Sequence, residues 1–210
     1  MTLSRMRTTT TVAAAAAAIA VLMLIAPAAQ AGPLVASDPD CAEQALTQPF
    51  APWLDPASYQ FAPDGGLESG GDGWTLDGAA TVVSGNESHY VHDSGDSASL
   101  SLGSGGSATS PTVCVGLEHP TIRFFTKRAS GLLASAGVEV LFEDASGHVL
   151  SAPIGTVSGV GSWQPTAPMA VVANLLPLLP GDHTPVQFRI TSLTGGLQID
   201  DLYVDPYRRG

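Results

Sequence analysis

Short runs of β-branched and aromatic residues recur from Tyr59 onward, separated by glycine, serine, aspartate and proline at intervals of about 8 to 12 residues. None of these runs keeps the 3.6-residue apolar period of a helix. This spacing is typical of β-sandwiches and barrels. We expect strands near Gly73–Leu76, Ala80–Ser84, Ser88–Val91, Ala98–Leu102, Ala108–Val115, Thr121–Lys127, Val138–Asp144, Val149–Ile154, Ser162–Ala170, Val186–Thr191 and Gln198–Val204.

Alternation of apolar and polar residues gives three of these strands an orientation. Ile122 and Phe124 alternate with Arg123, and the same pattern occurs in Val138–Asp144 and Val186–Thr191. Each strand therefore has one buried face and one polar face that we expect to be in contact with solvent. Strands of this kind favour two antiparallel sheets packed face to face.

The first residues have the order of an export signal. Arg5 and Arg7 precede the uncharged apolar stretch Val12–Ala26, and a small-x-small cleavage triplet ends at Ala31. The alternative is an uncleaved membrane anchor, because about 18 or more apolar residues can cross a bilayer. Pro27 interrupts the apolar run, which favours a cleaved signal peptide and a secreted product.

Cleavage after Ala31 leaves 179 of the 210 residues, a length that fits one domain. Three prolines in the segment around Phe50 and Trp53 predict an extended lead-in that covers an edge of the core. The expected organisation is a signal peptide over 1–31, an extended lead-in over 32–57 and, over 58–207, an all-β, two-sheet antiparallel β-sandwich (jelly roll).

The chain is strongly acidic, and its charge excludes some partners. Its formal net charge is −11, and loss of Arg5 and Arg7 with the signal peptide makes it −13. Nucleic acids and anionic membrane surfaces are held by lysine and arginine, so neither is an expected partner. The same acidity suits a secreted protein or one that gathers divalent cations. The sequence does not define the oligomeric state.

The chain has two cysteines, Cys41 and Cys114. Outside the reducing cytosol two such residues are expected to pair. Closing the intervening loop would stabilise the fold by about 4 kcal/mol in the chain-entropy model. A cysteine metal site is the alternative, but neither a Cys-x-x-Cys motif nor suitable histidine spacing is present.

Two motifs near the ends of the β region carry a resemblance. They are LESGGDGW at Leu67–Trp74 and LQIDDLYVDP at Leu197–Pro206. Their order resembles the carbohydrate-binding jelly rolls and galactose-binding-like sandwiches. The mature chain, with CVGLEHPTIRFF in its middle, also resembles a group of secreted actinobacterial proteins. The first resemblance implies a glycan or another cell-surface ligand, and the second implies no activity.

The jelly-roll resemblance also implies a structural Ca²⁺ site. In those families the first and last strands lie side by side, and each often contributes an acidic ligand, here Glu68 and Asp200. Alternation turns Asp200 toward the interior, where a carboxylate needs a cation or hydrogen-bond donors. In the alternative without an ion, Asp200 caps backbone amides and Glu68 pairs with Arg123 or Arg189.

Motifs for catalysis were not found. The chain has neither Gly-x-Ser-x-Gly nor His-Glu-x-x-His, so we assign no catalytic residue. A secreted hydrolase with an unmarked carboxylate pair and a purely structural envelope protein stay open as alternatives to a non-catalytic binding protein.

Aromatic and histidine side chains are the further candidates for ligand-binding or metal-binding groups. Trp74 and Trp163 are expected in the core. His89 and His92, three apart on an expected strand, would point to opposite faces and hold no common ion. Candidates for an exposed sugar-binding ring are Tyr59, Tyr90 and Phe125.

Overall fold

A computed structural model of the chain describes residues 45–116, 121–144, 146–171 and 183–205. The expected signal peptide and Cys41 lie outside these ranges. In the described part no helix is long and apolar enough to cross a membrane. The elements are β1 (Leu46–Thr47), η1 (Ala51–Trp53), β2 (Tyr59–Phe61), β3 (Thr75–Asp77), β4 (Ala80–Ser84), β5 (Ala98–Leu102), β6 (Ser107–Thr109), β7 (Val113–Val115), β8 (Thr121–Glu143), β9 (Val149–Ser158), β10 (Gln164–Pro165), β11 (Met169–Ala170) and β12 (Thr184–Val204).

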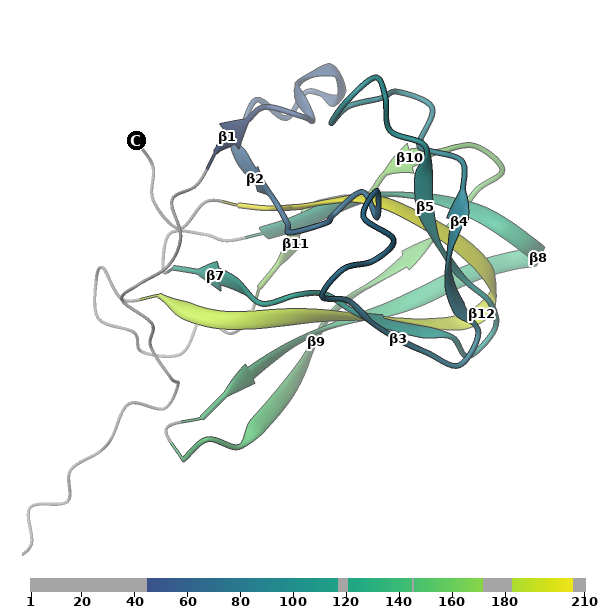
Figure 1. Cartoon of the computed structure of the whole chain (residues 1–210). Coiled ribbons are helices and arrows are strands. Elements are labelled where there is room, and N and C mark those ends of the chain that lie inside the picture. Colours follow the sequence, from purple (N-terminus) through teal and green to yellow (C-terminus); the bar gives the residue numbers. More distant parts are fainter. Residues whose placement is uncertain (1–44, 117–120, 145, 172–182, 206–210) are drawn as a thin grey trace, which may run out of the picture. The chain divides into compact units, whose positions relative to one another are not determined.

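Two long strands, β8 and β12, form the frame of the sandwich. They pair antiparallel along most of their length, from Ile122 with Val204 to Phe142 with Val186. Both bend together where β-bulges shift the register, and Figure 1 shows this bend at the end where the labels β8 and β12 lie. The sequence predicted two separate strands in each of these regions, and the structure corrects this to one continuous bent strand.

Glycine permits the bend. Gly131 in β8 and Gly195 in β12 both have positive φ, +82° and +63°. A Cβ on Gly195 would also collide with the backbone carbonyl oxygen of Leu133. Because only glycine adopts such a conformation without a side-chain clash, it allows β12 to pass from one layer to the other.

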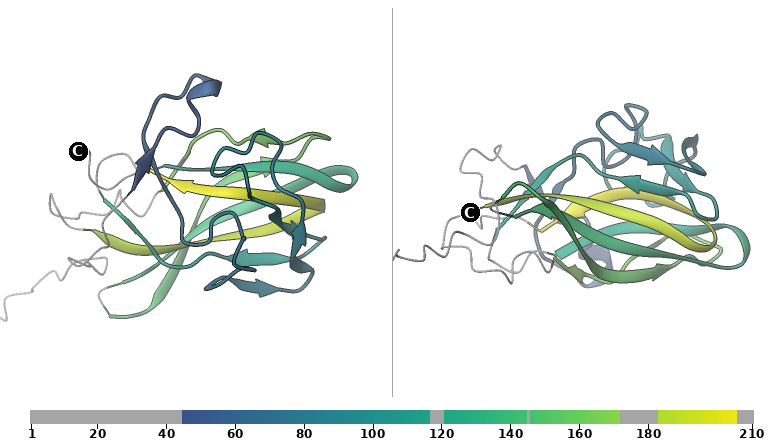
Figure 2. Two further views of the ribbon diagram at one scale, coloured as in Figure 1. Left: turned by 45° about the horizontal axis from the view of Figure 1, so that its top comes forward. Right: turned by 90° about the horizontal axis from the view of Figure 1, so that it is seen from below.

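The bend divides the hydrogen-bonded strands into two layers (Figure 2). In the first layer the start of β8 and the end of β12 are joined by β2, β4, β5, β10 and β11. In the second layer the other halves are joined by β3, β6, β7 and β9. All pairings are antiparallel, so the predicted all-β, two-sheet sandwich is confirmed.

The main core lies between the layers. Phe124, Leu100 and Ile199 of the first layer pack in one buried cluster with Val138 and Phe188 of the second. The inward faces predicted from alternation in β8 and β12 are therefore confirmed. Leu67 and Trp74 belong to the same cluster, which confirms the expected core position of Trp74.

A second apolar cluster covers the outer face of the first layer. Phe125 and Tyr203 project there and pack with Phe50 of the lead-in, Tyr59 of β2 and Trp163. This face was predicted to be in contact with solvent, and that prediction is wrong because the lead-in lies across it rather than along an edge. Trp163 is buried, as expected.

Arg123 projects from the same outer face and is only 5% exposed. Its guanidinium donates to Asp55 Oδ2 at 2.6 Å and to the Thr166 carbonyl at 2.8 Å, and it lies 4.1 Å from the centre of the Phe50 ring. Tyr59 donates its hydroxyl proton to the same Asp55 oxygen at 2.7 Å. This network fixes the lead-in to β8.

The electrostatics of this network follow from its burial. Burial acts to raise the pKa of Asp55, but hydrogen bonds from Tyr59 and Arg123 outweigh it and hold that pKa below its usual value. Burial, followed by the hydrogen bond to Asp55, raises the pKa of Tyr59 to about 12. Asp55 is therefore ionised and Tyr59 neutral at neutral pH.

The pairing of Cys41 with Cys114 stays a prediction, because Cys41 lies outside the described residues. Cys114 lies in β7, half-buried beside the start of β12. We expect thiol labelling of the denatured, unreduced protein to find no free thiol, and reduction to lower its thermal stability. Two labelled cysteines before reduction would contradict the pairing.

Candidate functional site

The connection between β4 and β5, residues 85–97, holds the most unusual polar chemistry of the described chain; we call it the 85–97 loop. Glu87 anchors it. Its backbone amide donates to Asp200 Oδ2 at 2.7 Å, and its fully buried carboxylate accepts the amides of His89 at 2.5 Å and Val91 at 2.6 Å. A single side chain therefore closes a tight turn over β12.

This arrangement explains why Ser88–Val91 is not a strand. Its apolar and polar alternation predicted one, but the structure forms a turn there. The Glu87 carboxylate accepts hydrogen bonds from two backbone amides that would otherwise donate to a neighbouring strand. His89 and His92 consequently do not follow strand geometry, and the argument that they point to opposite faces fails with it.

Glu68 fixes the other end of the same loop. Its Oε1 accepts the backbone amides of Ser97 and Ala98, both at 2.7 Å, and Oε2 accepts the Ser97 hydroxyl at 3.2 Å. The two arginines considered as alternative partners are engaged elsewhere, Arg123 with Asp55 and Arg189 with Glu139. Glu68 thus holds the end of the loop by accepting hydrogen bonds from it.

Asp200 is fully buried, as alternation predicted, and it caps amides. Oδ2 accepts the Glu87 amide, and Oδ1 accepts the amide of Asp201 at 3.0 Å. Glu68 and Asp200 therefore have separate hydrogen-bond partners in the structure. The Ca²⁺ site expected from this pair stays a prediction.

Asp201 is also fully buried, although strict alternation would place it outward. The register of β12 against β8 shifts between Asp200 and Tyr203, which marks a β-bulge, and Asp201 has a φ of +51°. The carbonyl of Gly65 accepts the Leu202 amide at 3.1 Å and so fixes the bulge from the other side. A bulge of this kind redirects a side chain, so two successive aspartates face the interior.

Burial has a large effect on both carboxyl groups. It is the main cause that raises the pKa of Asp200 to about 9, followed by the charge of Asp201. It also raises the pKa of Asp201 to about 7, followed by the charge of Glu87. Neither oxygen of Asp201 has a hydrogen bond of acceptable geometry, although the backbone amide of His92 lies close enough to lower its pKa.

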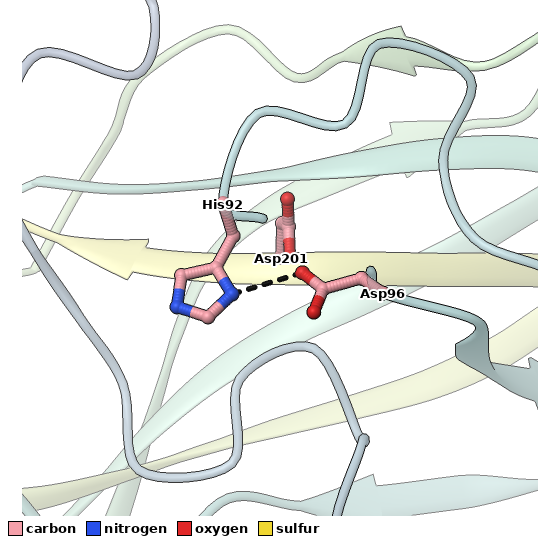
Figure 3. A group of neighbouring side chains, drawn as sticks. All are labelled: His92, Asp96 and Asp201. Carbon is pink, nitrogen blue, oxygen red and sulfur yellow. Dashed lines mark hydrogen bonds and ion pairs between the residues drawn. The ribbon is translucent and has the colours of Figure 1, made fainter. Parts of the chain in front are cut away.

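His92 and Asp96 of the 85–97 loop lie on either side of Asp201 (Figure 3). The Nδ1 of His92 is 2.9 Å from Asp96 Oδ2, and one potential ligand atom from each of the three residues lies within 4.8 Å of the other two. The imidazole stacks on Phe61, with ring centres 3.9 Å apart and planes 7° apart. Stacking fixes the orientation of the ring toward the two carboxyl groups.

Tyr90 is the exposed aromatic side chain of the described residues, at 52% exposure. Tyr59 and Phe125, the other two candidates from the sequence, are buried in the second cluster. Tyr90 has a φ of +51°, which is uncommon for a bulky residue, and the clamp of Glu87 on the next amide holds it there. Beside it, His89 contacts the half-buried Trp53 at 4.9 Å between ring centres.

Strain of this kind is found preferentially at binding sites. The sequence signalled part of this region through the Ile-Asp-Asp motif, whereas the His89–His92 spacing argued against a shared ion. Nothing in the sequence indicated that Glu87 would organise the loop, because its partners are backbone amides.

No protein-family model matches this chain, and no curated protein does. Among solved structures, the CBM22-1 and GH10 modules of the Clostridium thermocellum endo-1,4-β-D-xylanase, complexed with xylohexaose, match with 16% identity and a TM-score of 0.47. The match covers 69% of this chain and 28% of that one, so this chain spans about a quarter of its length.

Two further structures are similar. The CBM22-1 xylan-binding domain from Paenibacillus barcinonensis is 15% identical with a TM-score of 0.45, over 69% of this chain and 93% of that one. TmCBM61, in complex with β-1,4-galactotriose, is 19% identical with a TM-score of 0.42, over 69% and 96%. These similarities do not assign a ligand to this chain.

Proposed function

We propose that this protein is a secreted, non-catalytic β-sandwich that binds carbohydrate on a cell surface or in the surrounding medium, and that the 85–97 loop carries the binding surface. The observation that carries the proposal is Tyr90, an exposed ring held at a strained backbone position. The apolar C–H face of a pyranose packs against such a ring.

The surroundings of Tyr90 support a sugar ligand. His89 and Trp53 add a second aromatic pair next to it, and the exposed polar groups of His92 and Asp93 can hydrogen-bond hydroxyls. A rigid loop lowers the entropic cost of binding, because its conformation is already fixed before the ligand arrives. Glu87 and Glu68 supply that rigidity through hydrogen bonds at the two ends of the loop.

The non-catalytic part of the proposal rests on the accessibility of the acidic groups. A glycosidase needs two carboxyl groups about 5–9.5 Å apart on either side of a bound sugar. The closely spaced pair of this site, Asp200 and Asp201, is fully buried, and Glu87 beside it is buried as well. These carboxyl groups cannot reach a glycosidic bond.

Replacing Tyr90 by alanine is expected to weaken carbohydrate binding strongly. Affinity electrophoresis of the full chain on a panel of polysaccharides should show retardation on at least one, and Y90A should weaken that interaction at least about tenfold, equivalent to about 1.4 kcal/mol. Y90F is the matched control and should bind like the parent, because it keeps the ring.

Two results would contradict the proposal. Absence of retardation on every polysaccharide would remove the function, and equal binding by Y90A and the parent would place the ligand on another surface. Circular dichroism of Y90A checks that the sandwich is intact.

A further inference from the structure

Asp201 is a buried acidic side chain that is poorly satisfied, because the backbone amide of His92 lies near it without forming a well-aligned hydrogen bond. It is fully buried, and neither of its carboxyl oxygens accepts a hydrogen bond of acceptable geometry. Asp200, the neighbouring residue, accepts two backbone amides at 2.7 and 3.0 Å. A buried carboxyl group left unsatisfied is costly, so its retention calls for a ligand.

The groups that face Asp201 indicate what that ligand is. Glu87, Asp96 and Asp200 are acidic and add to the negative charge around it, while His92 opposes this charge. Ligand atoms of His92 and Asp96 complete a group within 4.8 Å. A cation between the three side chains would satisfy both oxygens of Asp201 and relieve the repulsion among the carboxylates.

We propose that His92, Asp96 and Asp201 form a binding site for a divalent first-row transition metal ion, such as Zn²⁺, that fastens the 85–97 loop to β12. Two ligands come from the loop and one from the bulge in the last strand (Figure 3). The site differs in its residues and its metal from the calcium expected at Glu68 and Asp200. It also does not depend on the proposed carbohydrate ligand.

The donor set selects the class of metal. Imidazole nitrogen suits zinc, copper, nickel and iron, whereas calcium takes six to eight oxygen ligands. Zn²⁺ binds nitrogen and carboxylate oxygen at about 2.0–2.2 Å, so ligand atoms around it stand about 3–4 Å apart. His92 Nδ1 and Asp96 Oδ2 are 2.9 Å apart, and a carboxylate oxygen of Asp201 lies within 4.8 Å of the ligand atoms of both residues.

Isothermal titration of the metal-free full chain with Zn²⁺ tests the proposal. We expect the parent to bind one ion per chain. D96N and D201N should bind no Zn²⁺ or bind it at least about tenfold more weakly. D96N keeps the shape of a half-buried side chain, so it separates loss of a ligand from loss of folding. Co²⁺ should give visible absorption bands that D201N removes.

His148→Ala is the matched control. His148 and Asp144 form another histidine and aspartate pair four residues apart, at 3.3 Å, but His148 is 76% exposed and the described residues give that pair no third ligand. H148A should bind Zn²⁺ like the parent, whereas H92A should not.

Three outcomes would overturn the proposal. They are equal Zn²⁺ affinity in D96N and the parent, equal losses in H148A and H92A, and displacement of Zn²⁺ by an equal concentration of Ca²⁺. The last result would show a site built for oxygen-preferring cations.

Discussion

Replacing Arg123 by alanine is expected to lower the free energy of unfolding by about 3–5 kcal/mol. The substitution leaves Asp55 without its cation in a half-buried position, frees the Thr166 carbonyl and removes the contact with the Phe50 ring. Because these contacts fix the lead-in to β8, we expect Phe50 and Tyr59 to become accessible. Urea denaturation followed by tryptophan fluorescence measures the loss.

Arg189→Ala is the control for this prediction. Arg189 also pairs with a carboxylate, Glu139 at 2.8 Å, but their side chains are 36% and 31% exposed. Exposed pairs contribute about 0–1 kcal/mol. Comparable losses of unfolding free energy in R123A and R189A would show that the buried Arg123 network stabilises the fold no more than an exposed ion pair does.

Replacing Asp201 by asparagine is expected to stabilise the metal-free protein at pH values above neutrality, by about 1–3 kcal/mol. The carboxyl group is fully buried and has no well-aligned hydrogen bond to lose. The amide has nearly the same shape and cannot ionise, so repulsion from Glu87 and Asp96 disappears. Chemical denaturation in the presence of a chelator measures the difference.

The sign of the pH dependence follows from proton binding. In the folded chain the pKa values of Asp200 and Asp201 are about 9 and about 7, against 3.8 for an unperturbed aspartate. Between the pKa of an unperturbed aspartate and these folded-state pKa values, the folded chain holds protons that the unfolded chain has released. The contribution of the pair to stability is therefore complete below about pH 4 and is lost as pH rises through about 7 and 9.

D201N should remove the loss of stability with rising pH that ionisation of Asp201 causes. Its advantage over the parent should be small near pH 5 and largest near pH 8. An advantage that is the same at both values would mean that ionisation of Asp201 does not cause it.

The sequence was sufficient for the fold class because alternation is a local property. Val138, Val140 and Phe188 could be assigned to the core from their spacing alone. The continuity of β8 and β12 was missed because Gly131 and Gly195 are typical of turns between strands, whereas here they allow a strand to bend. The second apolar cluster was missed because the same alternation of apolar and polar residues occurs whether the outer face of a strand is in contact with solvent or covered by a distant segment.

The candidate site was harder to predict, because its parts are set by tertiary contacts. The burial of Asp200 followed from alternation, but the burial of Asp201 depends on a bulge that leaves no mark in the sequence. Strand geometry would exclude His92 as a ligand, but Glu87 prevents a strand from forming there. Carboxylate-to-amide hydrogen bonds determine this loop, and a single sequence does not show which acidic residue will make them.

The passage of β8 and β12 through both layers has a consequence for how the chain folds. Neither layer has a complete set of strands of its own, so neither can form or open independently of the other. Partners such as Ile122 and Val204 are far apart in sequence, and the long loop between them must close before the pairing is gained. Folding should therefore be slow for the size of the domain and should occur in one cooperative step.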